Sequence, residues 1–194
     1  MGDFSQNGII SNLHDFGTKT TADIEKELVK FSKERKMELI LPSLYSELKG
    51  DALPNIVKQI SETKYLNHII VGLDKASKTE AVKAWKFFKK LNTPFTILWN
   101  DGPRLKKLHE ELKKKDLAPS EMGKGRNVWY CLGMCIARDE ARSVALHDCD
   151  IKTYDRRMLG KLFYPVVNPF FNFEFCKGYY PRISNGKMNG RVAR

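Results

Sequence analysis

Asp148 and Asp150 follow the short apolar run from Val144 to Leu146, and together they carry the clearest chemical signal in this chain of 194 residues. In an extended segment, side chains two positions apart point to the same side, so the two carboxylates can share one divalent cation. A cation held there can bind a diphosphate. Two aspartates after a strand can also simply cap the next turn, so the motif needs support from elsewhere in the sequence.

Gly123, Lys124 and Gly125 form a second motif, which opens a segment with apolar residues at helical spacing. Glycines just before a helix let backbone N–H groups approach a phosphate, and Lys124 adds a positive charge. The motif lies about one helix and one strand before Asp148. It lacks the spacing of a P-loop, and its alternative interpretation is a flexible turn with a solvated lysine.

The composition indicates one globular domain, because 42% of the residues are hydrophobic and 29% are charged. No apolar run is long enough to span a bilayer, and residues 1–20 lack the basic start and apolar centre of a signal peptide. We therefore expect a cytoplasmic protein without a membrane span. The cysteines lie in apolar or aromatic surroundings, which favours reduced thiols in the core over a metal site: Cys131, Cys135, Cys149 and Cys176.

The formal net charge of +11 has three candidate explanations: nucleic acid, an anionic membrane surface and small anionic ligands. Nucleic-acid binding is typically marked by a compact basic run interleaved with exposed aromatic residues. The lysines of this chain are instead spread over predicted helices, as in Lys106-Lys107 and Lys113-Lys114-Lys115. We therefore expect solvated helix surfaces and no nucleic-acid partner. A basic nucleic-acid-binding module is the alternative from a different functional class.

The hydrophobic periodicity predicts strands that alternate with helices. Strands are expected at residues 37–41, 68–73, 95–99 and 143–147, and helices at residues 22–36, 53–60, 77–91, 104–115 and after Gly125. Ser77 and Glu80 have the spacing of a capping box for the third of these helices. The alternation predicts an α/β fold, with a mostly parallel Rossmann-like sheet flanked by helices on both faces.

Proline is expected to end several of these elements. Pro42 should end the first strand and leave residues 42–47 as a loop. Tyr164-Pro165 and Asn168-Pro169 should break the chain before an aromatic strand at residues 171–180, and the basic residues 182–194 should form a mobile loop or tail.

Polar residues follow three of the predicted strands, at 42–47, at Asp74 and at 148–150. In a parallel α/β sheet, ligands collect outside the carboxyl ends of the strands. We therefore expect these three segments to converge on one site, which none of them would indicate alone.

In this order, the motifs resemble those of the GT-A class of nucleotide-sugar glycosyltransferases, and more closely those of the glucosyl-3-phosphoglycerate synthases. The matching segments are residues 41–47, 70–74, 123–125, the helix with Trp129, and residues 148–150, 175–182 and 190–192. The resemblance covers nearly the whole chain from Met37 onward. It implies that this chain is about the N-terminal half of such an enzyme, with the acceptor part truncated. The implied division is an N-terminal lead and helix (1–36), a donor-binding domain (37–163) and the start of the acceptor-binding region (164–194).

The resemblance also implies particular roles for single residues. A nucleotide diphosphate sugar, with UDP-glucose expected, would be bound by Pro42, Leu44 and Glu47 beside the uridine and ribose, Asp74 near the uracil, and Lys124 and Asp148. Asp148 and Asp150 would hold Mg²⁺ or Mn²⁺ against the diphosphate. Gly190 and Arg191 would meet a small anionic acceptor such as 3-phosphoglycerate.

Each donor-site position has a structural alternative. Pro42 can be a strand breaker, Leu44 a core residue, Glu47 a charge beside a helix and Asp74 a turn residue. Tyr45 can stack on a base or pack in the core. His147 is expected to be structural, because a lone histidine at a strand end is more often so.

The function implied by the resemblance is the transfer of glucose, with retention of configuration, to 3-phosphoglycerate or a similar small phosphorylated acid. The metal would neutralise the diphosphate leaving group, and no protein nucleophile is evident. Catalysis by this chain alone is not expected, because similar enzymes supply a metal-binding histidine and further acceptor contacts after the position of Arg194. The alternatives are a non-catalytic nucleotide-sugar binding fragment and a nucleotidyltransferase. The sequence leaves open the base, glucose against mannose, and whether the chain forms a homodimer.

Overall fold

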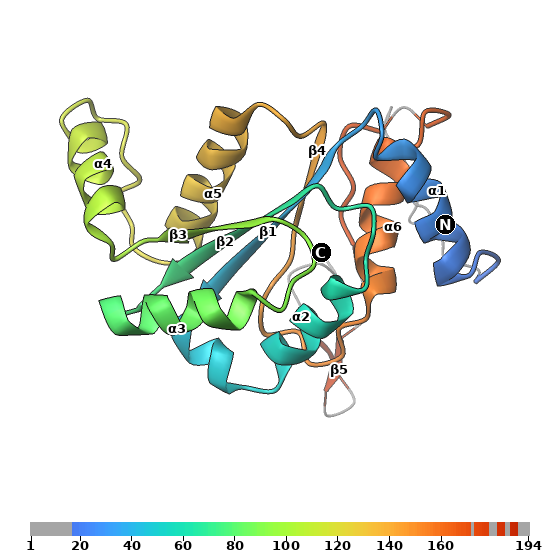
Figure 1. Cartoon of the computed structure of the whole chain (residues 1–194), viewed down its shortest axis with the longest axis horizontal. Helices are drawn as coiled ribbons and strands as arrows, with labels where there is room; N and C mark the ends of the chain where they lie inside the picture. Colours follow the sequence, from blue (N-terminus) through green and yellow to red (C-terminus); the bar gives the residue numbers. More distant parts are fainter. Residues whose placement is uncertain (1–16, 172, 179–181, 185–186, 190–194) are drawn as a thin grey trace.

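A parallel four-stranded sheet forms the centre of the molecule (Figure 1). The computed structural model describes residues 17–171, 173–178, 182–184 and 187–189. The strands are β1 (Met37–Leu44), β2 (His68–Asp74), β3 (Phe95–Trp99) and β4 (Ser143–Leu146), arranged in the order β3-β2-β1-β4. All three pairings are parallel. The predicted α/β fold with a parallel, helix-flanked sheet is therefore confirmed.

Helices cover both faces of this sheet (Figure 1). One face packs against α1 (Thr21–Phe31), α2 (Ala52–Ser61), α3 (Lys78–Phe88) and α6 (Arg156–Val167). The other face packs against α5 (Lys124–Arg138), and α4 (Pro103–Lys113) lies beyond it. Within β1, Leu39 and Leu41 join the first core while Ile40 joins the second, so the strand is buried on both sides and reads as a continuous apolar run.

The first strand continues through Pro42, so the prediction that this proline ends it is wrong. Pro42 pairs with Gly72 of β2, and Leu44 pairs with Asp74 at the end of the ladder. The backbone N–H of His147 donates to the Ile40 carbonyl, which shows that Ile40 faces β4. Pro42, two residues later, faces the same side, where the pairing with β4 has already stopped. The missing N–H of proline therefore costs no ladder hydrogen bond.

The predicted loop at residues 42–47 is partly helical, because Tyr45 begins the short 3₁₀ helix η1 (Tyr45–Lys49). The capping box of α3 is confirmed, because Ser77 accepts from the Glu80 N–H and Glu80 accepts from the Ser77 N–H. Ala84 and Phe88 are buried, but Val82 and Trp85 are about half exposed, and the helix ends before Leu91.

The prediction that Tyr164-Pro165 breaks the chain is also wrong, because α6 runs through Pro165. Leu159, Phe163 and Val167 are spaced four residues apart and are buried against the sheet, and this packing outweighs the helix-breaking tendency of the proline. No strand forms within the described residues of 171–178. The basic segment instead contributes a short antiparallel pair, β5 (Arg182–Ser184) and β6 (Lys187–Asn189).

The proposed division between residues 163 and 164 falls inside α6, and the assignment of donor and acceptor parts to its two sides stays a prediction. Across the described part of the chain, no helix has both the length and the apolar character needed to cross a membrane.

Candidate functional site

The strand order creates a topological switch point between β1 and β4. The chain passes from β1 outward to β2 and β3, and then returns to the opposite side of β1 to form β4. The carboxyl ends of all four strands lie along one edge of the sheet, and a switch point on that edge is where α/β proteins bind ligands. Pro42 and Leu44 of β1, Asp74 of β2 and Asp148 after β4 lie along this edge.

Lys124 and Asp148 lie directly against each other, although 24 positions separate them in the sequence. The Lys124 Nζ donates to Asp148 Oδ1 in an ion pair whose side chains are 55% and 47% exposed. Lys124 is the first residue of α5, and Asp148 follows β4 closely. The fold thus unites the two motifs that the sequence places one helix and one strand apart.

The start of α5 has the properties of an anion-binding helix end. Gly123, at the N-cap, has a φ of 132°, which strongly favours glycine, and it offers no side chain to cap the helix. The first backbone N–H groups of this 15-residue helix therefore have no side-chain acceptor at the cap. Positive helix polarity and the Lys124 ammonium coincide at this point.

A buried contact holds this helix end against the sheet. Asn127 is 3% exposed, and its Nδ2 donates to the Gly72 carbonyl of β2 at 2.8 Å. A Cβ on Gly72 would overlap the Asn127 amide and lie 2.7 Å from Cys131 Sγ. Asn127 was not singled out from the sequence. The available signal was Gly72 itself, a glycine inside an otherwise apolar strand, which often marks a close approach of another segment.

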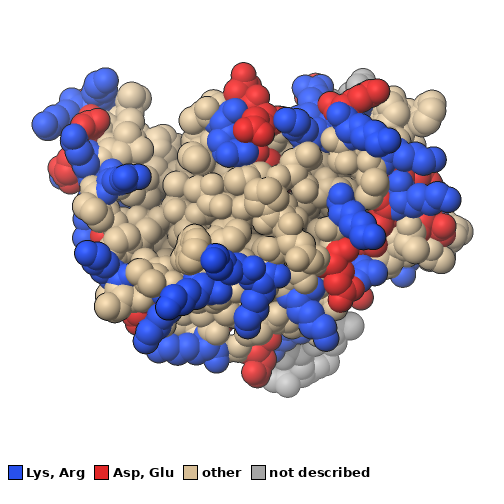
Figure 2. Space-filling model, viewed as in Figure 1, with Lys and Arg blue, Asp and Glu red and all other residues tan. Residues whose placement is uncertain are grey.

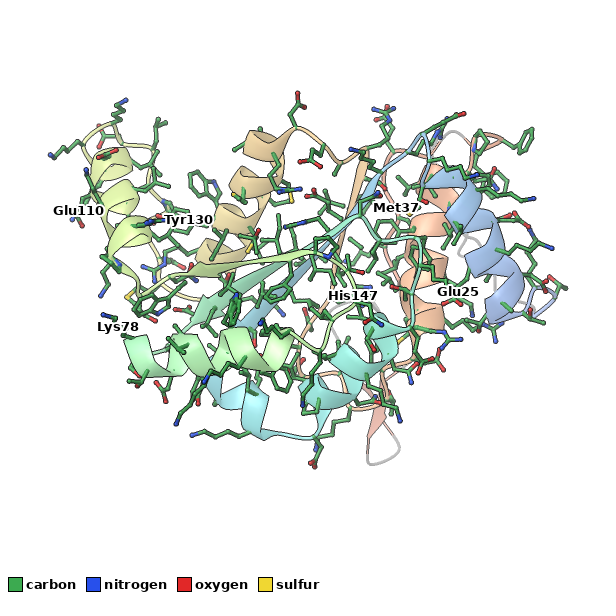
Figure 3. All side chains as sticks on the ribbon, viewed as in Figure 1. Glu25, Met37, Lys78, Glu110, Tyr130 and His147 are labelled. Atoms are coloured by element: carbon green, nitrogen blue, oxygen red, sulfur yellow. The ribbon has the colours of Figure 1, made fainter. Side chains whose placement is uncertain are left out.

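The Asp148–Asp150 segment places its polar side chains outward and its sulfur inward. Cys149 is buried, which raises the pKa of its thiol far above the ordinary value, while Asp148 is half-buried and Asp150 is exposed. His147 (Figure 3) is 3% exposed, and burial lowers its pKa to about 4, so the imidazole is neutral at pH 7. Its ring lies 5.3 Å from that of Tyr154, and neither ring nitrogen has a partner within the described residues. A structural role for His147 agrees with these surroundings.

Glu47 is tied to the end of β1. Its Oε2 accepts from the backbone N–H of Leu44 at 2.9 Å and caps η1. Pro42 is buried inside the strand and Leu44 is half-buried at its end. Tyr45 packs against Leu73 in a small core, so for this ring packing is the observed role.

Asp74 ends β2 in a rigid surrounding. It is 5% exposed, and its Oδ1 accepts from the N–H of Lys75, which adopts a left-handed conformation with φ of 52°. The loops after β2 and β3 are joined by two bonds at Ala76, whose N–H donates to Asp101 and whose carbonyl accepts from the Trp99 indole at 2.8 Å. Asp74 is therefore a turn residue in this structure, and its contact with a base stays a prediction.

The described residues contain no group of three or more histidine, cysteine, aspartate or glutamate side chains arranged to hold a metal ion. Asp148 and Asp150 would supply only two carboxylates. This number fits Mg²⁺, which is usually bound by one or two carboxylates together with substrate phosphates and water. The donor set thus suits a cation that a diphosphate completes. Gly190 and Arg191, the predicted acceptor residues, lie outside the described residues.

The predicted free thiols are confirmed within the described residues. Cys131, Cys135 and Cys149 are buried and Cys176 is partly exposed, and none is in a disulfide.

The parallel sheet flanked by helices makes this chain a Rossmann-like α/β protein, and a lysine and a carboxylate meet at its switch point. Over its whole length of 194 residues it is 44% identical to a glucosyl-3-phosphoglycerate synthase of Persephonella marina, of which it covers 48%. Over 188 residues, 95% of the chain, it is 36% identical to a glucosyl-3-phosphoglycerate synthase of Methanococcoides burtonii, of which it covers 46%. The resemblance predicted from the motifs is confirmed. The chain spans about half the length of these relatives, and no family model matches it.

We expect Gly72→Ala to displace the first turn of α5, because the new methyl group overlaps the Asn127 amide. Overpacking of this kind typically costs about 1–3 kcal/mol, and the loss should appear as a lower midpoint of thermal unfolding. The matched control is Gly133→Ala, which lies in α5 itself. Gly133 is exposed and has open space around its Cβ position, so this change should stabilise the helix by about 0.5–1 kcal/mol. Equal midpoints for the two variants would contradict the close approach.

Proposed function

We propose that the carboxyl edge of this sheet is the donor site of a metal-dependent glucosyltransferase that binds UDP-glucose. The observation that carries the proposal is the contact between Lys124 and Asp148 at the switch point, which unites a positive helix end and a carboxylate. The names of the two relatives support glucosyl transfer. Because the chain spans about half of each relative, transfer is proposed for the whole protein.

The acidic pair would hold the cation in this proposal. Asp148 and Asp150 would bind Mg²⁺ or Mn²⁺, and the bound metal would act as a Lewis acid that neutralises the diphosphate leaving group. Lys124 would turn from Asp148 toward the phosphate oxygens and, with the first N–H groups of α5, bind the remaining negative charge. The half-exposed ion pair allows this exchange, because a surface pair contributes only about 0–1 kcal/mol.

The ends of β1 and β2 would bind the nucleoside. The half-buried Leu44 at the end of β1 would offer apolar and backbone surface, with the buried Pro42 two positions before it, and Glu47 is held beside Leu44 by its bond to the Leu44 N–H. Asp74 is fixed at the end of the next strand and would accept from the uracil ring. The base preference for uracil is part of the proposal.

The acceptor would be 3-phosphoglycerate or a similar small phosphorylated acid, bound by Gly190 and Arg191. A guanidinium fork suits a phosphate or a carboxylate. The bond between the anomeric carbon and the diphosphate would break as the acceptor hydroxyl adds to the same face of that carbon, which keeps its configuration, and the hydroxyl proton would pass to the departing diphosphate oxygen.

We expect UDP-glucose to bind this chain only in the presence of Mg²⁺ or Mn²⁺, because the diphosphate charge must be shared with the cation at Asp148 and Asp150. Titration calorimetry with and without a chelator measures this dependence. Asp150→Ala should weaken metal-dependent binding, whereas Glu111→Ala, which removes an exposed carboxylate from α4, should leave it unchanged. The same affinity with and without the chelator would show that donor binding does not need a metal.

We expect Lys124→Ala to weaken donor binding by about 1.5–3 kcal/mol, the range for a hydrogen bond to a charged group. The thermal midpoint should hardly change, because the lost ion pair is half exposed. Lys113→Ala on α4 removes an equal charge and should leave the affinity intact. An unaltered titration curve for Lys124→Ala would reduce the motif to an ordinary helix start.

For the whole protein, we expect release of UDP to require both the divalent metal and 3-phosphoglycerate. Arg191→Ala should lower the rate mainly through weaker acceptor binding, because it removes the bidentate contact. The rate of UDP release against acceptor concentration separates this effect from loss of donor binding. A rate of UDP release that is the same with and without 3-phosphoglycerate would reject this acceptor.

A further inference from the structure

Helix α3 carries a concentrated positive charge that the proposed donor site does not use. Between residues 75 and 90 there are six lysines and one glutamate, which account for nearly half of the formal net charge of +11. Figure 2 shows lysine and arginine side chains gathered over α3 and the neighbouring α2, whereas positive and negative side chains are mixed over α1 and α6. The exposed side of this helix and of the two residues that follow it is called here the α3 lysine face, formed by Lys78, Val82, Trp85, Lys86, Lys89 and Lys90.

The charges of the α3 lysine face are not neutralised within the described part of the chain. No carboxylate of the described residues lies within ion-pair distance of these four lysines, and the described ion pairs involve other elements. The one acidic residue of α3, Glu80, uses its carboxylate in the capping box with Ser77. The lysines are therefore available to an external anion.

Two apolar side chains interrupt this basic surface. Val82 is 52% exposed and Trp85 is 47% exposed, three positions apart on the same side of the helix. The ammonium group of Lys89 lies 4.4 Å from the centre of the Trp85 ring. The folded chain thus presents, on one helix, the combination of lysines and exposed aromatic surface that the linear sequence did not reveal.

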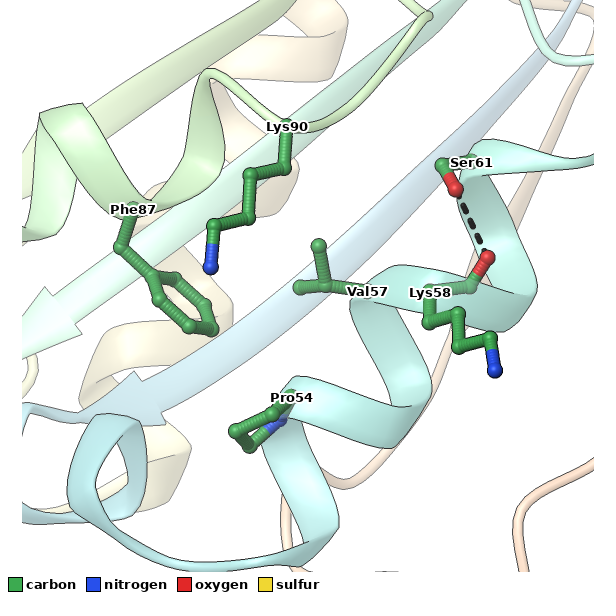
Figure 4. Close-up of a pocket in the computed structure, with 6 residues that line it drawn as sticks. All are labelled: Pro54, Val57, Lys58, Ser61, Phe87 and Lys90. Atoms are coloured by element: carbon green, nitrogen blue, oxygen red, sulfur yellow. Dashed lines mark hydrogen bonds between the residues drawn. The ribbon is translucent and has the colours of Figure 1, made fainter.

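A cavity of about 260 Å³ opens at the end of this face, between α2 and the last turn of α3 (Figure 4). Its walls are Pro54, Val57, Lys58 and Ser61 from α2, and Phe87 and Lys90 from the α3 side. The Lys90 side chain extends toward Phe87, with its Nζ 5.2 Å from the ring centre. An aromatic ring, two lysines and a hydroxyl suit a flat group that carries a phosphate.

We propose that the α3 lysine face and this cavity bind single-stranded nucleic acid. The lysines would contact successive phosphates, and the bases would lie against Trp85 and enter the cavity beside Phe87, as in other sites that combine a basic track with stacking rings. An anionic membrane is flat and would leave the cavity unused. The part of the face from Trp85 to Lys90 lies apart from the donor site, because α3 begins just after the carboxyl end of β2 and leads away from it, while α5 covers the opposite face of the sheet (Figure 1). The proposal revises the expectation that this chain has no nucleic-acid partner.

The test measures binding of the 194-residue chain to fluorescein-labelled oligothymidylate and oligouridylate by anisotropy, with chelator present and at several salt concentrations. For a single strand, log K falls with log salt by about 0.7 per neutralised phosphate. The double variant K86Q/K89Q should therefore reduce the slope by about 1.4. The matched control K106Q/K107Q on α4 removes the same charge and should change the affinity less than about twofold.

Trp85→Ala tests stacking apart from charge. It should weaken binding at least about fivefold with the salt slope unchanged, since stacking of one base on an aromatic ring contributes about 1–3 kcal/mol. Trp85→Phe, which keeps an aromatic ring, should retain most of the affinity that Trp85→Ala loses. Both substitutions are at a half-exposed position, and the midpoint of thermal unfolding checks that they leave the fold intact.

Several results would overturn the proposal. An equal effect of the α3 and α4 lysine variants would assign the binding to diffuse charge, and binding to vesicles of phosphatidylglycerol without binding to oligonucleotide would assign the face to a membrane. Competition by UDP-glucose with metal would place the strand in the donor site. Absence of oligonucleotide binding at 50 mM salt would reject the proposal outright.

Discussion

The closeness of α5 to the sheet at Gly72 is the constraint on which the arrangement of the site depends. Only a residue without a side chain permits the Asn127 amide to reach the Gly72 carbonyl at 2.8 Å. This bond lies beside Pro42 in the ladder, two positions after Ile40, the last residue of β1 that pairs with β4. The first turn of α5 is thereby held over the switch point, and Lys124 meets Asp148 there.

The same layered construction separates the two kinds of positive charge in this molecule. Lys124 lies at the start of the helix on one face of the sheet, at the edge where the strands end. The lysines of α3 point outward from the helix layer on the opposite face, since Ala84 and Phe88 occupy its inner side. The two basic regions therefore belong to different helix layers, with a sheet that is buried on both faces between them. The net charge of +11 does not describe a single surface.

The sequence predicted the sheet and the approximate site well, because strands in a parallel sheet are continuous apolar runs and polar residues must follow them. It failed where tertiary contacts overrule local preferences. Pro42 continues β1 since the neighbouring ladder has ended, and Pro165 stays in α6 since Phe163 and Val167 are buried on both sides of it. Asn127 was missed because its role depends on a glycine 55 positions earlier. The outward position of Trp85 was missed because helical spacing alone does not say which apolar residues face the core.

Burial distinguishes the parts of the site that hold shape from the part that can exchange partners. Asn127, Gly72 and Cys131 are buried, and a polar group there that lost its partner would pay a desolvation cost of about 1–3 kcal/mol. Lys124 and Asp148 are about half exposed, so water can replace either partner at little cost. A cation and a diphosphate can therefore separate this pair without disturbing the helix that carries the lysine. The buried Asn127–Gly72 contact fixes the position of the helix, and the exposed Lys124–Asp148 contact can open. A ligand can therefore bind to a site whose backbone is already in place.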